Sequence, residues 1–307
     1  MILFASCRPL ERAENIKAVW EAYDGEKEFI QMDGTRDNEE LGDSKYSILV
    51  TDEFVTRSPG TCIFIGHGIA GGKTFGLDQP DPYHSLADAR LISWAITTGR
   101  LTANLTAKQC GIPITKVLPL GMPRTDAYFG AKRRETNKRI YLYTPTFRKF
   151  WEGDDPLKTT DFAKLDSLLN DNELFIVKAH MIDEDPELDY KHIVVASKDE
   201  PTTDYLINCD VLVTDYSSIV FDAYLLERPV VLFAKDSFDY LWNRGMYFRY
   251  PEAYSGRFCD NEYDLVRLLR DAYRPTEEET LTKQIACDMC DGHSTERVVR
   301  LLKSMEA

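Results

Sequence analysis

The sequence has few basic residues for its length, and this shortage limits what the protein can bind. Its 307 residues include 37 Lys and Arg against 51 Asp and Glu, which gives a formal net charge of −14 and a pI of about 4.9. Proteins that bind nucleic acids normally present a basic patch or stripe, and anionic membranes attract basic segments. The charge balance therefore argues against a nucleic-acid partner and against strong electrostatic adhesion to a membrane.

Long apolar runs are also missing. No stretch approaches the roughly 20 apolar residues that a membrane-spanning helix needs. Residues 1–8 place no basic leader before their apolar run, so we interpret them as a first strand and not as a signal peptide. The expected location is the cytoplasm, with at most peripheral contact at the inner face of the membrane.

Cysteine is sparse, and clusters with the spacing of metal ligands are absent. The seven cysteines are scattered or lie inside apolar runs, as Cys62 and Cys209 do, which indicates reduced, buried thiols. Cys287 and Cys290 form a single CxxC, which without a second pair or a flanking βαβ unit is only weakly indicative of a metal or redox site. We expect that the protein requires neither a metal nor a cofactor.

The length and the hydrophobic pattern predict two wound α/β domains. Hydrophobic residues make up 43% of the chain, enough for packed cores, and strand-like runs alternate with helical ones, as in parallel sheets. The charged segment 131–139 is interpreted as a linker, which leaves an N-terminal domain at 1–132 and a C-terminal domain at 139–285. Strands are expected near 2–5, 29–32, 47–51, 61–66, 93–98, 116–120, 140–144, 174–178, 192–195, 211–214 and 230–233, and helices near 10–23, 103–110, 160–170, 202–208, 219–226 and, with a break near 291–293, 277–305.

The stretch 210–222 is the most informative part of the chain. It predicts a buried strand at 211–214 that leads directly into a helix starting near Ser218. Ser217 or Ser218 would cap this helix, and the free N–H groups of its first turn would suit a phosphate. Ligands of open α/β sheets bind beyond the carboxyl ends of the strands, where this turn would lie. Taken alone, an ordinary capped helix is the more common explanation.

Other predicted strand ends also carry residues that suit chemistry. His67 lies between two glycines, where the backbone can turn sharply, and its imidazole could act as a general base near neutral pH. His180 follows Lys178 by two residues, and Arg148 offers a forked cation that fits a phosphate. Each of these residues alone is more often structural. Together, mostly cationic and neutral groups in an acidic protein indicate a phosphorylated ligand.

The segment 68–74 resembles a P-loop but does not match its pattern. That pattern requires a glycine six residues before Lys73, and His67 occupies this position. The segment that follows is rich in proline and predicts no helix to hold a phosphate. We therefore do not interpret the chain as a P-loop NTPase.

The order and spacing of these motifs resemble the CDP-glycerol glycerophosphotransferase family, the teichoic-acid primases and polymerases. The resemblance covers roughly residues 62–302. It is carried by His67-Gly68, the Gly-x-Pro-Arg-x-Asp of 121–126, the Tyr-x-Pro-Thr-x-Arg of 143–148, Lys178-Ala-His180, the Thr-Asp-Tyr-Ser-Ser of 214–218 with Asp222, Arg228-Pro229 and the Arg-Gly-x-Tyr-Phe of 244–248.

The resemblance implies an α/β protein of GT-B fold, in which two Rossmann-like domains with parallel sheets face a central cleft. The nucleotide would bind mainly to the C-terminal domain, and the helix at 286–307 would cross back to the N-terminal, acceptor-side domain. His67 would be the catalytic base and His180 a second catalytic histidine near the diphosphate. The donor-binding set would be Thr146, Arg148, Lys178, Asp215, Ser217, Ser218 and Arg244.

The implied reaction transfers glycerol phosphate, or a similar polyol phosphate, from a CDP-alcohol to a hydroxyl of a glycan or lipid-linked acceptor and releases CMP. Such a step belongs to the synthesis of teichoic acid, capsule or a related cell-surface polymer. The family usually has Trp-His-Gly-Thr-Pro where this chain has 66–70, and the proline after the second histidine is Met181 here. These departures leave the acceptor open.

Two other functions stay open on the sequence alone. The first is a GT-B glycosyltransferase that uses a nucleotide sugar and keeps His67 as the base. The second is a non-catalytic protein that binds a nucleotide or a glycan.

Overall fold

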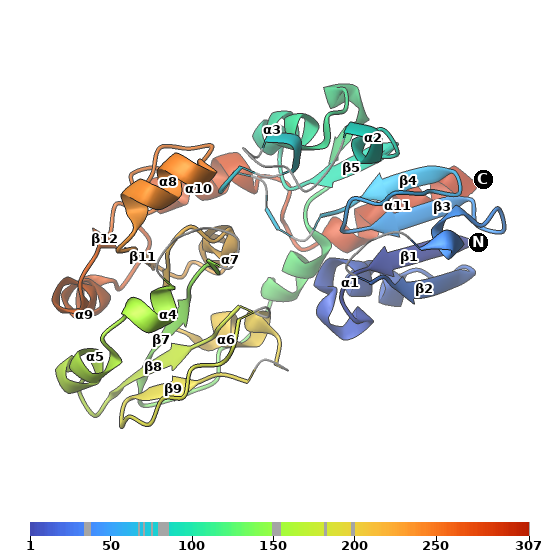
Figure 1. Cartoon of the computed structure of the whole chain (residues 1–307). Helices are drawn as coiled ribbons and strands as arrows, with labels where there is room; N and C mark the ends of the chain where they lie inside the picture. Colours follow the sequence, from blue (N-terminus) through green and yellow to red (C-terminus); the bar gives the residue numbers. More distant parts are fainter. Residues whose placement is uncertain are drawn as a thin grey trace. The chain divides into compact units, whose positions relative to one another are not determined.

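The computed structural model divides the chain into two compact units, and each has its own parallel sheet (Figure 1). Unit 1 comprises Met1–Phe129 and Gln284–Ala307, and unit 2 comprises Gly130–Lys283. The structure describes residues 1–33, 38–66, 68–69, 71–74, 76–78, 86–148, 155–180, 183–197 and 200–306.

Unit 1 is built on six parallel strands in the order β2-β1-β3-β4-β5-β6. The strands are β1 Ile2–Ser6, β2 Lys27–Gln31, β3 Ile48–Thr51, β4 Thr61–Phe64, β5 Trp94–Thr97 and β6 Val117–Pro119. The helices are α1 Glu14–Ala22, α2 Leu86–Ala89, α3 Arg100–Cys110 and α11 Ser294–Glu306, with short 3-10 turns η1 Leu10–Arg12, η2 Glu39–Gly42, η3 Gly76–Asp78, η4 Ile114–Lys116 and η5 Pro123–Tyr128.

The sheet of unit 1 is covered on both faces, which explains why its central strands β1, β3, β4 and β5 are nearly continuous apolar runs. On one face Phe4 and Val50 pack against α1 and α11, the latter through Val298 and Leu302. On the other face, Ala95 packs against α2 and α3. The last helix of the chain thus completes the core of the first unit, and α11 lies beside the N-terminal strands in Figure 1.

Unit 2 repeats this architecture. Its strands are β7 Arg139–Thr144, β8 Glu173–Val177, β9 Ile193–Val195, β10 Val211–Thr214, β11 Val230–Phe233 and β12 Phe258–Cys259. Its helices are α4 Pro156–Thr159, α5 Phe162–Leu168, α6 Thr202–Asn208, α7 Ile219–Leu225, α8 Ser237–Arg244 and α9 Glu262–Asp271, and α10 Glu277–Ala286 leads from unit 2 back into unit 1.

The strand order of unit 2, β12-β11-β10-β7-β8-β9, is the Rossmann order 3-2-1-4-5-6 read from the other edge. Helices α4, α5 and α9 cover the face that carries Tyr143, Val213 and Phe233, while α7 contacts β10 and α6 contacts β7. The strand order reverses between β7 and β10, whose residues pair in register from Val211 with Tyr141 to Thr214 with Thr144. Ligands of such sheets bind at this reversal, beyond the strand ends.

The segment interpreted as a linker is attached to unit 2. The division of the chain falls between Phe129 and Gly130. Arg133 forms an ion pair with Asp210 at the start of β10, and the N–H of Arg134 donates to the side chain of Asn208. The charged segment 131–139 is therefore held to unit 2 at Arg133 and Arg134 and is not solvated along its whole length.

The structure corrects two predicted helices. The helix expected at 10–23 is divided into η1 and α1, because Ala13 leaves the helical conformation with φ −85° and ψ 62°. The helix expected at 160–170 is shorter and runs as α5 from Phe162 to Leu168, because Thr160 ends the preceding α4 and Asp161 caps α5 by accepting from the N–H of Lys164.

Candidate active site

The strand ends on both sides of the reversal in unit 2 are joined by hydrogen bonds. The hydroxyl of Thr214 donates to the carbonyl of Thr144 at 2.6 Å. Just beyond, the carboxylate of Asp215 accepts from the N–H of Thr146 at 2.8 Å and from the N–H of Tyr216 at 2.6 Å. Asp215 is buried and thus fixes the turn after β10 against the loop after β7. The hydroxyls of Thr144 and Thr146 are buried and have no hydrogen-bond partner among the described residues.

Arg148 lies at the centre of this arrangement. Its side chain is 4% exposed and forms ion pairs with Asp215, at 2.9 Å, and with Asp236, at 2.7 Å. Its third nitrogen donates to the carbonyl of Thr146. Burial opposes the charge of the guanidinium, but the two carboxylates outweigh this effect and hold the pKa of Arg148 above its ordinary value. Arg148 therefore stays charged and is already neutralised by the protein.

The turn after β10 brings two serine hydroxyls to the start of α7. Ser218 is the N-cap residue, but its side chain makes no capping bond. Ser217 instead accepts from the N–H of Ile219 at 3.3 Å. The cap predicted from the sequence is thus made by the backbone of Ser218 and the hydroxyl of Ser217, and both serines are partly exposed beside Asp215.

The residues predicted at the end of β8 lie near the same loop. The ring of His180 packs on Phe147, with 4.6 Å between the ring centroids. Phe147 lies between Thr146 and Arg148 in the chain, so His180 borders the loop after β7. Lys178 is buried, and its ammonium donates to the carbonyl of Ser197 at 2.7 Å.

Helix α8 forms a further wall of the cluster. Tyr240 stacks on Tyr216 with 3.7 Å between the ring centroids and 8° between the ring planes. The hydroxyl of Tyr216 donates to Asp236 at 2.9 Å, just before α8. Arg244 is buried at the end of this helix. Asp236 was not predicted as a site residue, although a polar residue that closely follows strand β11 is the same signal that identified Asp215.

The proposed base, His67, lies outside the described residues. The residue before it, Gly66, has φ +60°, a left-handed conformation that favours glycine. The side chain of Asn15 donates to the carbonyl of Gly66 and accepts from the N–H of Arg124, both at 3.0 Å. Asn15 is 2% exposed. It therefore attaches the end of this loop to η5, and no signal in the sequence pointed to it.

The motif at 121–126 has a structural role in the first unit. The carboxylate of Asp126 accepts from the N–H groups of Ser294, at 3.0 Å, and Thr295, at 2.7 Å, and so caps α11. At Gly121, an added Cβ would lie 2.2 Å from the hydroxyl of Ser294 and 2.5 Å from the carbonyl of Met289. The motif thus docks the C-terminal helix.

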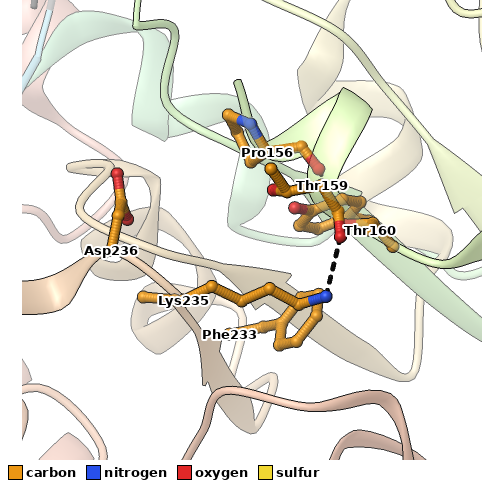
Figure 2. Close-up of a pocket in the computed structure, with 8 residues that line it drawn as sticks. Pro156, Thr159, Thr160, Phe233, Lys235 and Asp236 are labelled. Carbon is orange, nitrogen blue, oxygen red and sulfur yellow. Dashed lines mark hydrogen bonds between the residues drawn. The ribbon is translucent and has the colours of Figure 1, made fainter. Parts of the chain in front are cut away.

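A pocket opens beside the cluster, on the face of the sheet that α4 and α5 cover (Figure 2). Tyr143, Pro156, Thr159, Thr160, Phe233, Ala234, Lys235 and Asp236 line it. Figure 2 shows Lys235 extended towards α4, where its ammonium donates to the carbonyl of Thr159 at 2.8 Å. The same ammonium pairs with Glu262 at 2.7 Å. The ammonium of Lys235, the cation among these lining residues, is therefore already paired within the protein.

Other candidate chemistry of the sequence has no assembled site in the described ranges. No three His, Cys, Asp or Glu side chains come together there as ligands of a metal ion. None of the helices described is both long and apolar enough to cross a membrane. The seven cysteines are thiols, and burial raises the pKa of Cys62 and Cys209 to about 12, so both stay protonated near neutral pH. Cys287 and Cys290 are buried between α10 and α11.

Two Rossmann-like units, each with a parallel six-stranded sheet, define an α/β protein of the GT-B class. The profile of the CDP-glycerol:poly(glycerophosphate) glycerophosphotransferase family matches residues 2–304. The chain belongs to this family.

Individual relatives agree with this assignment. The teichoic acid poly(ribitol-phosphate) polymerase of Bacillus spizizenii is 25% identical over 97% of this chain and 55% of its own length. The teichoic acid glycerol-phosphate primase of Bacillus subtilis is 23% identical over 84% of this chain and 71% of its own length. The chain thus spans about half of the first relative and about seven tenths of the second.

Solved structures show the same fold. The wall teichoic acid polymerase TagF aligns with a TM-score of 0.78 over 99% of this chain and 88% of that chain, at 17% identity. One TagF variant was soaked with CDPG. The UDP-GlcNAc 2-epimerase of Methanocaldococcus jannaschii, in complex with UDP-GlcNAc and UDP, aligns with a TM-score of 0.62 at 13% identity over all of that chain and 99% of this one.

Proposed function

We propose that the protein transfers glycerol phosphate, or a similar polyol phosphate, from a CDP-alcohol to a hydroxyl of a glycan or lipid-linked acceptor. The observation that supports this best is the joined cluster at the strand reversal of unit 2, where Asp215 fixes the turn that carries Ser217 and Ser218. The family and its teichoic-acid relatives supply the donor class and the pathway, synthesis of teichoic acid or a related surface polymer.

In the proposed reaction the acceptor oxygen attacks the β-phosphorus of the donor. His67 accepts the proton of the acceptor hydroxyl as the new P–O bond forms. The bond between the β-phosphorus and the bridging oxygen breaks, and CMP leaves with the electron pair. Positive or hydrogen-bonding groups must then stabilise the charge on the oxygens of the leaving phosphate.

The groups proposed to hold the diphosphate surround the reversal in unit 2. The hydroxyls of Ser217 and Ser218 lie at the start of α7. The hydroxyl of Thr146 is buried and without a partner among the described residues, so it has a hydrogen bond left to donate. His180 borders the same loop through Phe147, and we propose it as the second catalytic histidine. The proposal also keeps Lys178, Asp215 and Arg244 in the donor-binding set.

The proposal includes no metal, no cofactor and no nucleic-acid partner. It places the reaction in the cytoplasm, with at most peripheral contact at the inner face of the membrane. The proposed base comes from the part of the sequence that forms unit 1, and the donor residues come from unit 2.

The test is release of CMP from CDP-glycerol and CDP-ribitol in the presence of candidate acceptors, with UDP- and GDP-sugars in parallel. We expect His67→Ala to abolish turnover and to leave the affinity for CDP unchanged. His293, directly before α11, supplies a control because its side chain is 68% exposed. His293→Ala should leave both turnover and the affinity for CDP unchanged. Release of UDP or GDP in place of CMP would favour a sugar transferase, and CDP binding without turnover in any assay would favour a binding protein.

A further inference from the structure

Arg148 connects three separate strand ends of unit 2. It follows β7, its partner Asp215 follows β10, and its partner Asp236 follows β11. The two nitrogens that face Asp236 donate to its two oxygens, at 2.7 and 3.1 Å, which is the forked geometry that arginine prefers with a carboxylate. The side chain of Arg148 is almost fully buried and lies inside the cluster that these strand ends form.

Aromatic rings hold the same guanidinium from the side of α8. Its carbon lies 5.1 Å from the ring centroid of Tyr216 and 4.8 Å from that of Tyr240. Those two rings stack on each other, and Tyr216 also donates to Asp236. Helix α8 is therefore fixed to the turn after β10 through both the stacked rings and Asp236.

These contacts are hard to combine with a direct role in holding the donor. Each of the three nitrogens of Arg148 already has a protein acceptor. Arg148, Asp215 and Asp236 together carry one net negative charge, which repels a diphosphate. A guanidinium that served as a phosphate ligand would have to give up one of its buried carboxylates, and leaving such a partner unpaired is costly.

We propose that Arg148 is a positioning residue: through Asp215 and Asp236 it fixes the donor-binding turn at 215–218 and does not itself contact the diphosphate. The proposal rests on the function proposed above for the identity of the donor. It assigns Asp236 and Tyr240, which no motif of the sequence includes, to the same positioning unit.

The two possible roles of Arg148 predict opposite changes in CDP affinity for one substitution. Asp236→Asn removes a negative charge and leaves the cation of Arg148 less neutralised. If Arg148 contacted the diphosphate, this change would strengthen CDP binding. If Arg148 positions the turn, the same change loosens it, and we expect the dissociation constant for CDP to rise about tenfold. Tyr240→Leu keeps every charge and should weaken CDP binding in the same direction.

The experiment combines calorimetric titration with CDP and hydrogen exchange without ligand, on the full-length protein. In Asp236→Asn we expect faster amide exchange at Thr146 and Tyr216, whose N–H groups donate to Asp215. Glu173→Gln is the matched control, because it also removes a carboxylate from an ion pair, here the partly buried pair with Arg270 at the other end of the strands. It should change neither the exchange of these amides nor CDP binding.

Two results would overturn the positioning role. The first is CDP binding by Asp236→Asn that equals or exceeds that of the wild type. The second is unchanged exchange at Thr146 and Tyr216 in both Asp236→Asn and Tyr240→Leu. If the wild type binds no CDP, the proposed function fails, and the exchange experiment still decides the role of Arg148 because it needs no ligand.

Discussion

At the scale of single residues, Asn15 shows how one buried amide can fix a loop that sequence motifs only mark. Asn15→Ala would remove both of its hydrogen bonds and leave the carbonyl of Gly66 and the N–H of Arg124 without this partner. Such a loss costs about 1–3 kcal/mol in stability. We expect turnover to fall strongly and CDP affinity to stay unchanged, because Asn15 belongs to unit 1. Initial rates and calorimetric titration measure the two quantities.

A buried threonine of the same unit provides the control for Asn15. Thr106→Val removes the hydrogen bond from Thr106 to Thr97, also buried, in a part of unit 1 that carries no predicted site residue. It should lower stability and leave turnover unchanged. Equal losses of turnover in Asn15→Ala and Thr106→Val would mean that the effect reflects unit 1 as a whole and not its Gly66 loop.

The sequence identified several site residues where strand ends carry polar groups, but it missed Asn15, which lies in a helix, and Asp236, which follows β11. Asp215, Ser217 and His180 follow apolar runs directly, so the parallel-sheet rule was sufficient to place them near one edge. Asn15 and Asp236 bond to groups 51 and 88 residues away. No local pattern encodes the pairing of Asn15, whereas Asp236 carried the strand-end signal and was overlooked. The interpretation of Arg148 as a phosphate ligand likewise did not include the two carboxylates that the fold brings to it.

At the scale of elements, the motif at 121–126 explains how the last helix is docked on unit 1. Gly121 has φ +89° and no room for a Cβ beside Ser294 and Met289. Gly130 has a similar φ of +84° but nothing within 4 Å of a Cβ. Gly130→Ala should therefore cost only the left-handed strain of about 1–2 kcal/mol. Gly121→Ala should cost clearly more, because it also pushes α11 away. Chemical denaturation of both variants measures the difference. If Gly121→Ala and Gly130→Ala destabilised the protein equally, the close contact of Gly121 with α11 would have no energetic importance.

The cap that Asp126 places on α11 gives an independent comparison. Asp126→Ala should cost about 0.5–2 kcal/mol in stability, the usual range for a lost N-cap.

The ion pair between β8 and α9 predicts a pH dependence. Burial of Glu173 disfavours its charge, but hydrogen bonds from Arg270 and Tyr141 outweigh burial and lower its pKa below the ordinary 4.5. A carboxylate whose pKa is lowered by folding stabilises the protein above its unfolded pKa and loses this contribution as the pH falls through its folded pKa. The stability advantage of the wild type over Glu173→Gln should thus be full near neutral pH and shrink below pH 4.5. Urea unfolding at a series of pH values tests this, and an advantage that stayed constant down to pH 3 would contradict it.

Elements with strong local patterns were predicted well. The strands β10 and β11 and the helix α6 have the predicted bounds, and for the two strands apolar β-branched runs leave few alternatives. Helices α8 and α9 were not predicted. For α9 a signal existed, because Asn261 caps it by accepting from the N–H of Asp264, and Leu265 and Leu269 follow at helical spacing. For α8 no comparable cap exists, as Asp236 makes no capping bond and is used by Arg148.

At the scale of the whole molecule, the chain builds two cores and crosses between the units twice. The second crossing matters because residues 284–307 belong to unit 1, although they follow the whole of unit 2 in the sequence. Unit 1 therefore cannot complete its core until residues 284–307 have been made. Each core should respond separately to substitutions within it, and a ligand of one unit should stabilise that unit first.

Calorimetry can resolve this division with one substitution in each core. Leu302 of α11 and Leu265 of α9 are both 0% exposed, so replacing either by alanine should cost about 2–5 kcal/mol. We expect Leu302→Ala to lower the thermal transition of unit 1 and Leu265→Ala that of unit 2. CDP at a hundredfold excess over its dissociation constant should stabilise unit 2 by about 2.7 kcal/mol. It should not shift the thermal transition of unit 1, which Leu302→Ala lowers. A single transition that both variants lower and CDP raises throughout would show instead that the two cores unfold as one cooperative unit.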